Sequence, residues 1–152
     1  MNPLERVKTN RDTSYFLMLA AEQRGHTVFH IDPSQLSVDH NRVMSILTRV
    51  QVDEDEGNPF QVLSSKWEYL DTVDVVWIRT DPPVDRSYIY VTLLLDLLPS
   101  TVRVINKAST IRDWNEKLVS LRYPEWIPRT LVARDIQSIE GRRPGFGRGK
   151  LR

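Results

Sequence analysis

Apolar and polar positions along the chain follow helical and strand periodicities in turn. Residues 12–24 show a helical pattern with one apolar face, and Asp12 or Thr13 supplies the N-cap. Residues 86–98 predict a second helix, which Pro99 ends, and residues 109–113 and 116–122 predict short helical turns. The predicted strands cover residues 27–31, 44–52, 60–63, 73–79, 101–105 and 130–133. Alternating strands and helices indicate an α/β sandwich.

The segment 73–85 is the most informative, because an apolar strand runs directly into a charged loop stiffened by Pro82 and Pro83. A continuous apolar strand is typical of a sheet covered on both faces, which predicts parallel strands. Ligands of such sheets bind at the carboxyl ends of the strands. Arg79 and Asp81 are therefore candidate ligand residues, since a guanidinium matches a carboxylate and Asp81 could orient it or receive an ammonium. The alternative is a rigid surface turn with an Arg79–Asp81 ion pair.

Two further polar positions are candidates for ligand contact. Asn106 directly follows the predicted strand at 101–105, so it repeats the arrangement of Arg79. Lys117 could contact phosphate oxygens, and its alternative is an ordinary solvated lysine on a helix. No catalytic residue and no metal ligand is assigned, because the three histidines lack ligand spacing and cysteine is absent.

Composition narrows the class of protein. A chain of 152 residues with 40% apolar and 27% charged residues predicts a single globular domain. The sequence has no apolar run long enough for a membrane span and no apolar signal segment, and with the lack of cysteine this predicts a cytoplasmic protein. Residues 141–152 carry five basic residues and no acid, so the first 140 residues have a net charge of −4, five below the whole chain's +1. This argues against nucleic acid as a partner of the body.

The two ends of the chain depart from a complete α/β domain. Nothing resembling a strand precedes Asp12, although such domains normally open with a strand, so the first strand is expected to be missing. Residues 140–152 are rich in glycine and arginine and predict a disordered basic tail. The tail does not match a phosphate-binding loop, and an RNA-contacting role for it is a third, weaker interpretation.

Three segments in order resemble the amino-terminal part of prokaryotic glutathione synthetase, a member of the ATP-grasp ligases. They are the helical segment 11–25, the loop and helix at 78–92 with its Arg-Thr-Asp-Pro-Pro-Val-Asp motif, and the segments 104–107 and 111–118 with Asn-Lys and Arg-Asp-Trp-Asn-Glu-Lys-Leu. The resemblance covers residues 1 to about 139. Ala108 stands where the family has proline.

The resemblance implies a Rossmann-like pre-ATP-grasp domain with a mostly parallel sheet over residues 1–117, followed by the start of the ATP-grasp region at 118–139. The family joins glycine to γ-glutamylcysteine with ATP and Mg²⁺, and its amino-terminal domain contributes to subunit contacts, which implies a homo-oligomer. By resemblance Lys117 is the residue that contacts ATP. Arg79, Asp81 and Asn106 are candidates for substrate binding.

The chain is therefore interpreted as the substrate-side domain of such a ligase, truncated at both ends. Most of the ATP-grasp core lies beyond the resemblance, and phosphoryl transfer depends on the metal and charge clamps of that core. We expect the chain alone to be inactive and to bind neither ATP nor Mg²⁺ tightly. The alternative is a non-catalytic binding module that docks to a full-length synthetase or another partner.

Overall fold

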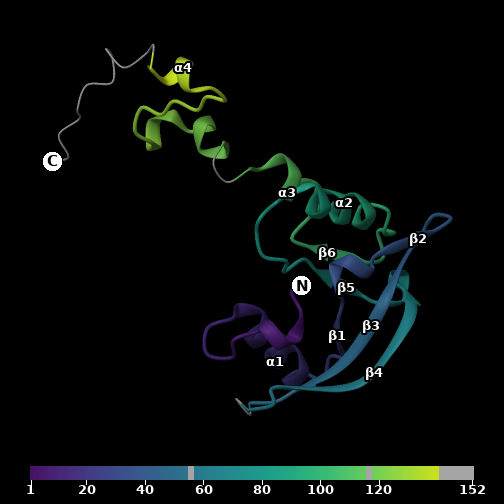
Figure 1. The fold of residues 1–152 in the computed structure, drawn as a ribbon. Coiled ribbons are helices and arrows are strands. Elements are labelled where there is room, and N and C mark those ends of the chain that lie inside the picture. Colours follow the sequence, from purple (N-terminus) through teal and green to yellow (C-terminus); the bar gives the residue numbers. More distant parts are fainter. Residues whose placement is uncertain (55–56, 116–117, 141–152) are drawn as a thin grey trace. The chain divides into compact units, whose positions relative to one another are not determined.

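The computed structural model describes residues 1–54, 57–115 and 118–140, and these form a mixed α/β structure. The chain is divided into two compact units. The first comprises Met1–Asp113 and the second comprises Trp114–Arg152. The first unit contains every strand of the described residues (Figure 1). The strands are β1 (Val28–His30), β2 (Ser37–Asp39), β3 (Arg42–Val52), β4 (Phe60–Tyr69), β5 (Val75–Trp77) and β6 (Arg103–Ile105).

Two α-helices of the first unit begin at aspartates that cap them. The side chain of Asp12 accepts a hydrogen bond from the backbone of Ser14, and α1 ends before Gly25, whose φ of 80° is the left-handed conformation that glycine adopts readily. Asp85 caps the next helix in the same way. The α-helices are α1 (Thr13–Gln23), α2 (Arg86–Leu95) and α3 (Ala108–Asp113), with 3₁₀ turns at Leu4–Arg6, Pro33–Gln35 and Leu70–Thr72.

The larger sheet is antiparallel and is organised around β3. This strand pairs with β1, β2 and β4, and all three pairings are antiparallel. The β2–β3 hairpin turns through His40 and Asn41, and His40 adopts a left-handed φ of 54°. Short connections of this kind permit only antiparallel neighbours. The prediction of a mostly parallel sheet was therefore wrong for the described strands, although the α/β class is confirmed.

Parallel pairing is found in the smaller sheet, where β5 and β6 align Trp77 with Ile105. The segment between them includes α2, which is the long crossover that parallel strands require. Burial alternates along β5 and its extension, with Val76 and Ile78 buried while Val75 and Trp77 are exposed. The expectation that this strand is covered on both faces was therefore wrong within the described residues.

Two hydrophobic cores form along β3. One combines Val43 and Leu47 of β3 with residues of the β5–β6 sheet, α2 and α3, and Leu70 at its centre is completely buried. The other combines Val50 and Val52 of β3 with side chains of α1. A register shift between Arg49 and Val50 changes the buried positions of β3 from odd to even numbers.

The second unit is short of regular structure. Its described elements are 3₁₀ turns at Val119–Arg122 and Pro124–Trp126 and the helix α4 (Ile136–Glu140). The predicted strand at 130–133 is not formed, and the described part of this unit contains no strand with which it could pair its backbone groups. The predicted boundary at residue 117 and the tail at 141–152 lie outside the described residues. None of the described helices has the length and apolar character needed to cross a membrane.

Residues 1–12 of the first unit contain no strand. The missing first strand and the Rossmann-like topology stay predictions.

We predict that Leu70→Ala lowers the free energy of unfolding by about 2–5 kcal/mol, because it leaves a cavity at the centre of the larger core. Leu97→Ala is the matched control, because Leu97 is 51% exposed while Leu70 is 0% exposed. The control should change the free energy of unfolding by less than about 0.5 kcal/mol. Urea unfolding followed by circular dichroism measures both, and equal losses in the two variants would contradict the assigned core.

Candidate functional site

The carboxyl ends of β5 and β6 bring three of the four sequence-predicted residues to one edge. Arg79 and Asp81 follow β5 in the chain, and Asn106 follows β6 directly. The side-chain amide of Asn106 donates a hydrogen bond to the backbone carbonyl of Ile78 at 3.4 Å, which fixes it beside the start of the Arg79 loop. The fourth residue, Lys117, lies outside the described residues. Because β5 and β6 are parallel and Trp77 is aligned with Ile105, the residues that follow both strands lie at the same edge of the sheet.

Arg79 joins this edge to the start of α1. Its Nε donates to the hydroxyl of Ser14 at 3.3 Å, across 65 positions of the sequence. Ser14 is buried, and its backbone N–H donates to the carboxylate of Asp12 at 2.8 Å. The guanidinium is half-buried and makes no ion pair with any described residue.

Asp81 is engaged by the amino-terminal segment and not by Arg79. Its carboxylate accepts a hydrogen bond of 2.6 Å from the side-chain amide of Asn2, and its backbone N–H donates to Asn2 Oδ1 at 3.5 Å. The ion pair between Arg79 and Asp81, which the sequence offered as the alternative interpretation, is therefore not formed. Sequence reasoning did not single out Asn2, because a contact across 79 positions leaves no local pattern.

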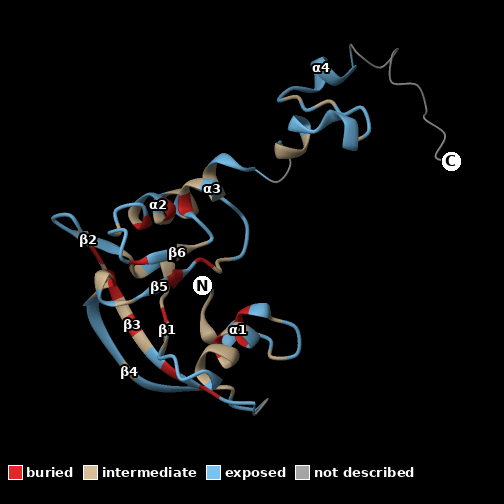
Figure 2. Ribbon diagram, turned by 180° about the vertical axis from the view of Figure 1, so that it is seen from behind, coloured by how far each residue is buried: buried red, intermediate tan, exposed pale blue. Residues whose placement is uncertain are grey.

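The amino terminus lies between the two sheets (Figures 1 and 2). The ammonium of Met1 donates to the carbonyl of Ile31 at the end of β1, at 3.0 Å. The His30 ring is 3.0 Å from the backbone carbonyl of Asn2, and since a carbonyl only accepts, Nε2 is the donor. Together with the contact between Asn2 and Asp81, these bonds connect the end of β1 to the loop after β5.

Burial and hydrogen bonds together shift the pKa values of the groups around this segment. It lowers the pKa of the Met1 ammonium, although the carboxylates of Asp32 and Asp81 oppose the shift. Burial also lowers the pKa of the His30 imidazole; the hydrogen bond to the carbonyl of Asn2 opposes this shift, and the charge of the amino terminus adds to it. Burial alone would raise the pKa of Asp32, but hydrogen bonds from Ser34 outweigh it, so that this pKa is lowered.

Tyr88 contacts the backbone of the loop that follows Arg79. Its hydroxyl donates to the carbonyl of Thr80 at 3.5 Å, and its backbone N–H donates to the capping carboxylate of Asp85 at 2.9 Å. Burial raises the pKa of this hydroxyl, while the charge of Arg79 opposes the shift. The hydroxyl therefore stays protonated at neutral pH and acts as a hydrogen-bond donor.

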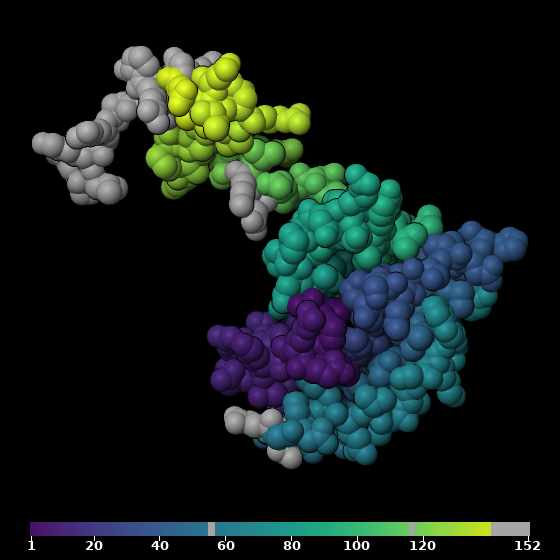
Figure 3. All heavy atoms as spheres, in the orientation of Figure 1, coloured from purple at the N-terminus to yellow at the C-terminus, as the bar shows by residue number. Residues whose placement is uncertain are grey.

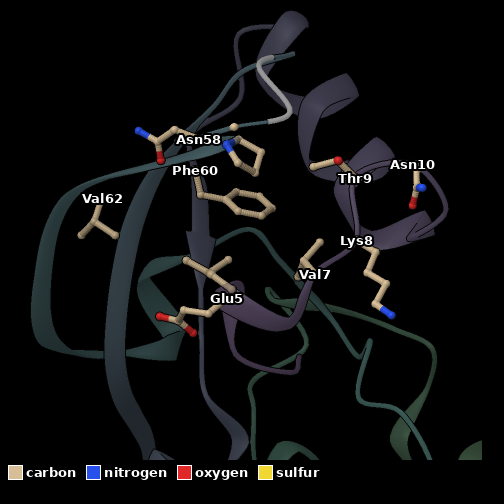
Figure 4. A pocket seen from close by; sticks show the side chains of 11 residues that line it. Glu5, Val7, Lys8, Thr9, Asn10, Asn58, Phe60 and Val62 are labelled. Carbon is tan, nitrogen blue, oxygen red and sulfur yellow. The ribbon is translucent and has the colours of Figure 1, made fainter.

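An open hollow of about 590 Å³ lies elsewhere in the first unit. The segment 4–10 forms one wall and residues 57–62 form the other, and Phe60 projects toward Val7 and Thr9 (Figure 4). None of the sequence-predicted site residues lines it. Among the described residues, no group of three or more His, Asp or Glu side chains is placed to hold a metal ion, so none of them is assigned to Mg²⁺.

Comparison with known proteins identifies the family. The family described as prokaryotic glutathione synthetase, N-terminal domain, matches residues 1–112. The chain belongs to this glutathione synthetase family. The match spans the whole edge described above, from Met1 to Asn106.

Individual relatives agree with the family match. The glutathione synthetase of Coxiella burnetii is 33% identical over 133 residues, which is 87% of this chain and 41% of the relative. The glutathione synthetase of Gloeobacter violaceus is 36% identical over 91% of this chain and 45% of its own length. That of Vibrio parahaemolyticus is 30% identical over 97% and 47%, respectively. The chain thus spans less than half the length of these glutathione synthetases.

We predict that the free energy of unfolding falls as the pH decreases from about 8 to about 6. In this range the unfolded chain takes up protons at the amino terminus and at His30, whereas the folded chain, in which both pKa values are lowered, takes them up only at lower pH. His30→Gln keeps an N–H donor for the carbonyl of Asn2 but does not titrate, so its slope should be shallower. Urea unfolding at a series of pH values measures the slopes, and identical slopes would contradict a buried neutral His30.

Proposed function

We propose that this chain supplies the substrate-side wall of a glutathione synthetase active centre and that Arg79 binds a carboxylate of γ-glutamylcysteine. The observation that carries the proposal is the state of the Arg79 guanidinium. It is half-buried at the end of β5, held by a hydroxyl, and not neutralised by any described carboxylate.

The electrostatics of this position favour an anion. A half-buried charge loses part of its hydration, and a carboxylate restores the lost interactions through two parallel hydrogen bonds to the guanidinium. The start of α1, where Arg79 meets Ser14, adds the partial positive charge of a helix amino terminus. Asp81, two positions further along the loop, accepts a hydrogen bond from Asn2 and forms no ion pair with Arg79, so the guanidinium remains available for an anionic ligand.

In this proposal Asp81 binds the ammonium of the substrate, and Asn106 offers it a neutral hydrogen-bonding group. The carboxylate of Asp81 is exposed and already accepts an N–H donor from Asn2, so the ammonium of the substrate's γ-glutamyl group could take that place. The amide of Asn106, which is also exposed, supplies a neutral donor and acceptor beside β5. ATP is assigned to Lys117 by resemblance alone. The glutathione synthetases that the chain resembles are more than twice its length.

A second candidate is a non-catalytic module that docks to a full-length synthetase. The exposed apolar side chains of Tyr90, Leu93 and Leu97 on and just after α2 favour it, because three large apolar groups at helical spacing are characteristic of a protein-binding face. The two candidates differ in what a full-length synthetase would do when the chain is added to it. A docking module changes the rate of that enzyme, whereas a substrate-binding fragment leaves it unchanged while substrate is in excess.

We predict that Arg79→Ala weakens the binding of γ-glutamylcysteine by about 10- to 100-fold, the loss expected for a hydrogen-bonded charge pair. Arg79→Lys should recover part of the affinity, because lysine keeps the charge but lacks the planar fork. Arg103→Ala is the control, since Arg103 is an exposed arginine at the opposite end of the β5–β6 pair. Titration followed by nuclear magnetic resonance measures the affinities, and equal losses in the Arg79 and Arg103 alanine variants would contradict the assigned site.

We predict that the purified chain alone releases no phosphate from ATP in the presence of glycine, γ-glutamylcysteine and Mg²⁺. Substrate positioning without the metal and charge clamps of phosphoryl transfer leaves most of the barrier in place. A coupled phosphate-release assay measures the rate, with a full-length family member as the positive control. Turnover that depends on all the substrates would show that the chain is a complete ligase.

A further inference from the structure

Ser14 carries a buried hydroxyl whose partner is a charged side chain from a distant part of the chain. It lies in the first turn of α1, is 5% exposed, and accepts the Nε–H of Arg79 at 3.3 Å. The space-filling view shows the purple amino-terminal segment, which includes α1, against the teal segment that follows β5 (Figure 3). A buried polar side chain normally has a hydrogen-bond partner, and here the partner is the arginine that is proposed to bind the substrate.

The helix does not need this hydroxyl for its own capping. Asp12 is the N-cap residue of α1, and its carboxylate already accepts the backbone N–H of Ser14 at 2.8 Å. Inside a helix, serine also has a lower intrinsic propensity than alanine. The hydroxyl of Ser14 therefore contributes to the contact with Arg79 rather than to the helix.

The residues that follow Ser14 fix its position. Tyr15 and Met18 are buried in the core that α1 forms with β3. The hydroxyl of Tyr15 donates to the backbone carbonyl of Asp53 at 2.8 Å, which ties the first turn of α1 to the residue after β3. A hydroxyl on a turn that is packed and bonded in this way is an acceptor with a defined place.

The contact with Ser14 uses one of the three nitrogens of the guanidinium. A carboxylate can bind arginine side-on, through Nε and one terminal nitrogen, or end-on, through both terminal nitrogens. Because the Nε–H of Arg79 points to the hydroxyl of Ser14, the side-on edge is occupied and the end-on edge points away from Ser14. Within the described residues, the two terminal nitrogens have no hydrogen-bond partner and form no ion pair.

We propose that Ser14 is a positioning residue, which holds the Nε of Arg79 so that both terminal nitrogens meet the substrate's carboxylate end-on. This inference rests on the proposed function of Arg79 and adds the residue that orients its guanidinium. A free arginine side chain has many rotamers and loses this freedom when it binds a ligand. A fixed acceptor at Nε removes part of that freedom in advance, so that less is lost when the carboxylate binds.

The neutrality of the hydroxyl is part of this role. A carboxylate at position 14 could accept the same Nε–H, but it would also neutralise the guanidinium and compete with the substrate's carboxylate. A hydroxyl accepts the hydrogen bond and leaves the positive charge in place. Ser14 therefore orients Arg79 without reducing its attraction for an anion.

Titration of the full chain with γ-glutamylcysteine, followed by nuclear magnetic resonance, tests Ser14 in a double-mutant cycle with Arg79. Ser14→Ala should weaken binding by about three- to tenfold, the loss expected for one hydrogen bond. In the Arg79→Ala background the same substitution should cause no further loss, because no guanidinium is left to orient. Ser14→Thr keeps the hydroxyl and should recover most of the affinity.

Two more variants separate orientation from charge and from burial. Ser14→Asp should weaken binding at least as much as Ser14→Ala, because its carboxylate neutralises the guanidinium. Ser45→Ala is the matched control, since Ser45 is also a buried serine but its hydroxyl has no hydrogen-bond partner among the described residues. This control should leave the affinity unchanged. Circular dichroism confirms that every variant is folded.

An Arg79→Ala variant with unchanged affinity would overturn both this inference and the proposed function. Where Arg79→Ala does weaken binding, two results would overturn the role of Ser14 alone. One is an unchanged affinity in Ser14→Ala. The other is an equal loss from Ser14→Ala with and without Arg79, which is the sign of a merely structural serine.

Discussion

The pairing of β3 with three other strands is the interaction on which the first unit depends. Its eleven residues hold β1 and β2 on one side and β4 on the other, so that each of these strands is positioned through β3. The same strand contributes buried side chains to both hydrophobic cores, with Leu47 in one and Val50 in the other. The register shift between Arg49 and Val50 lets a single strand serve two cores that face different helices.

The amino-terminal segment connects the two sheets near the edge that carries Arg79. The larger and the smaller sheet share no strand pairing in the described residues, and Met1 and Asn2 connect them by hydrogen bonds to Ile31 and Asp81. Asn2 donates a hydrogen bond to the acidic residue of the loop, Asp81, whereas Arg79 donates to the neutral hydroxyl of Ser14. Both contacts join segments that are far apart in the sequence.

The two edges of the larger sheet have different chemical character. On the side of β1, polar and titratable groups gather around a partly buried amino terminus. On the side of β4, the backbone edge has no paired strand within the described residues, and Trp67 is 53% exposed. β3 lies between these two edges.

Local patterns in the sequence determined the cap of α1, the starts of α1 and α2, the positions of β1, β3 and β6, and the presence of Arg79 and Asn106 at strand ends. Periodicity and capping act over a few residues, so the sequence records them directly. The antiparallel direction of the larger sheet, the exposed outer face of β5 and the partner of Asp81 were decided by the tertiary structure alone. Each depends on which distant segment lies beside a strand, and no local pattern carries that information, because the side chains and backbone groups that meet belong to residues tens of positions apart.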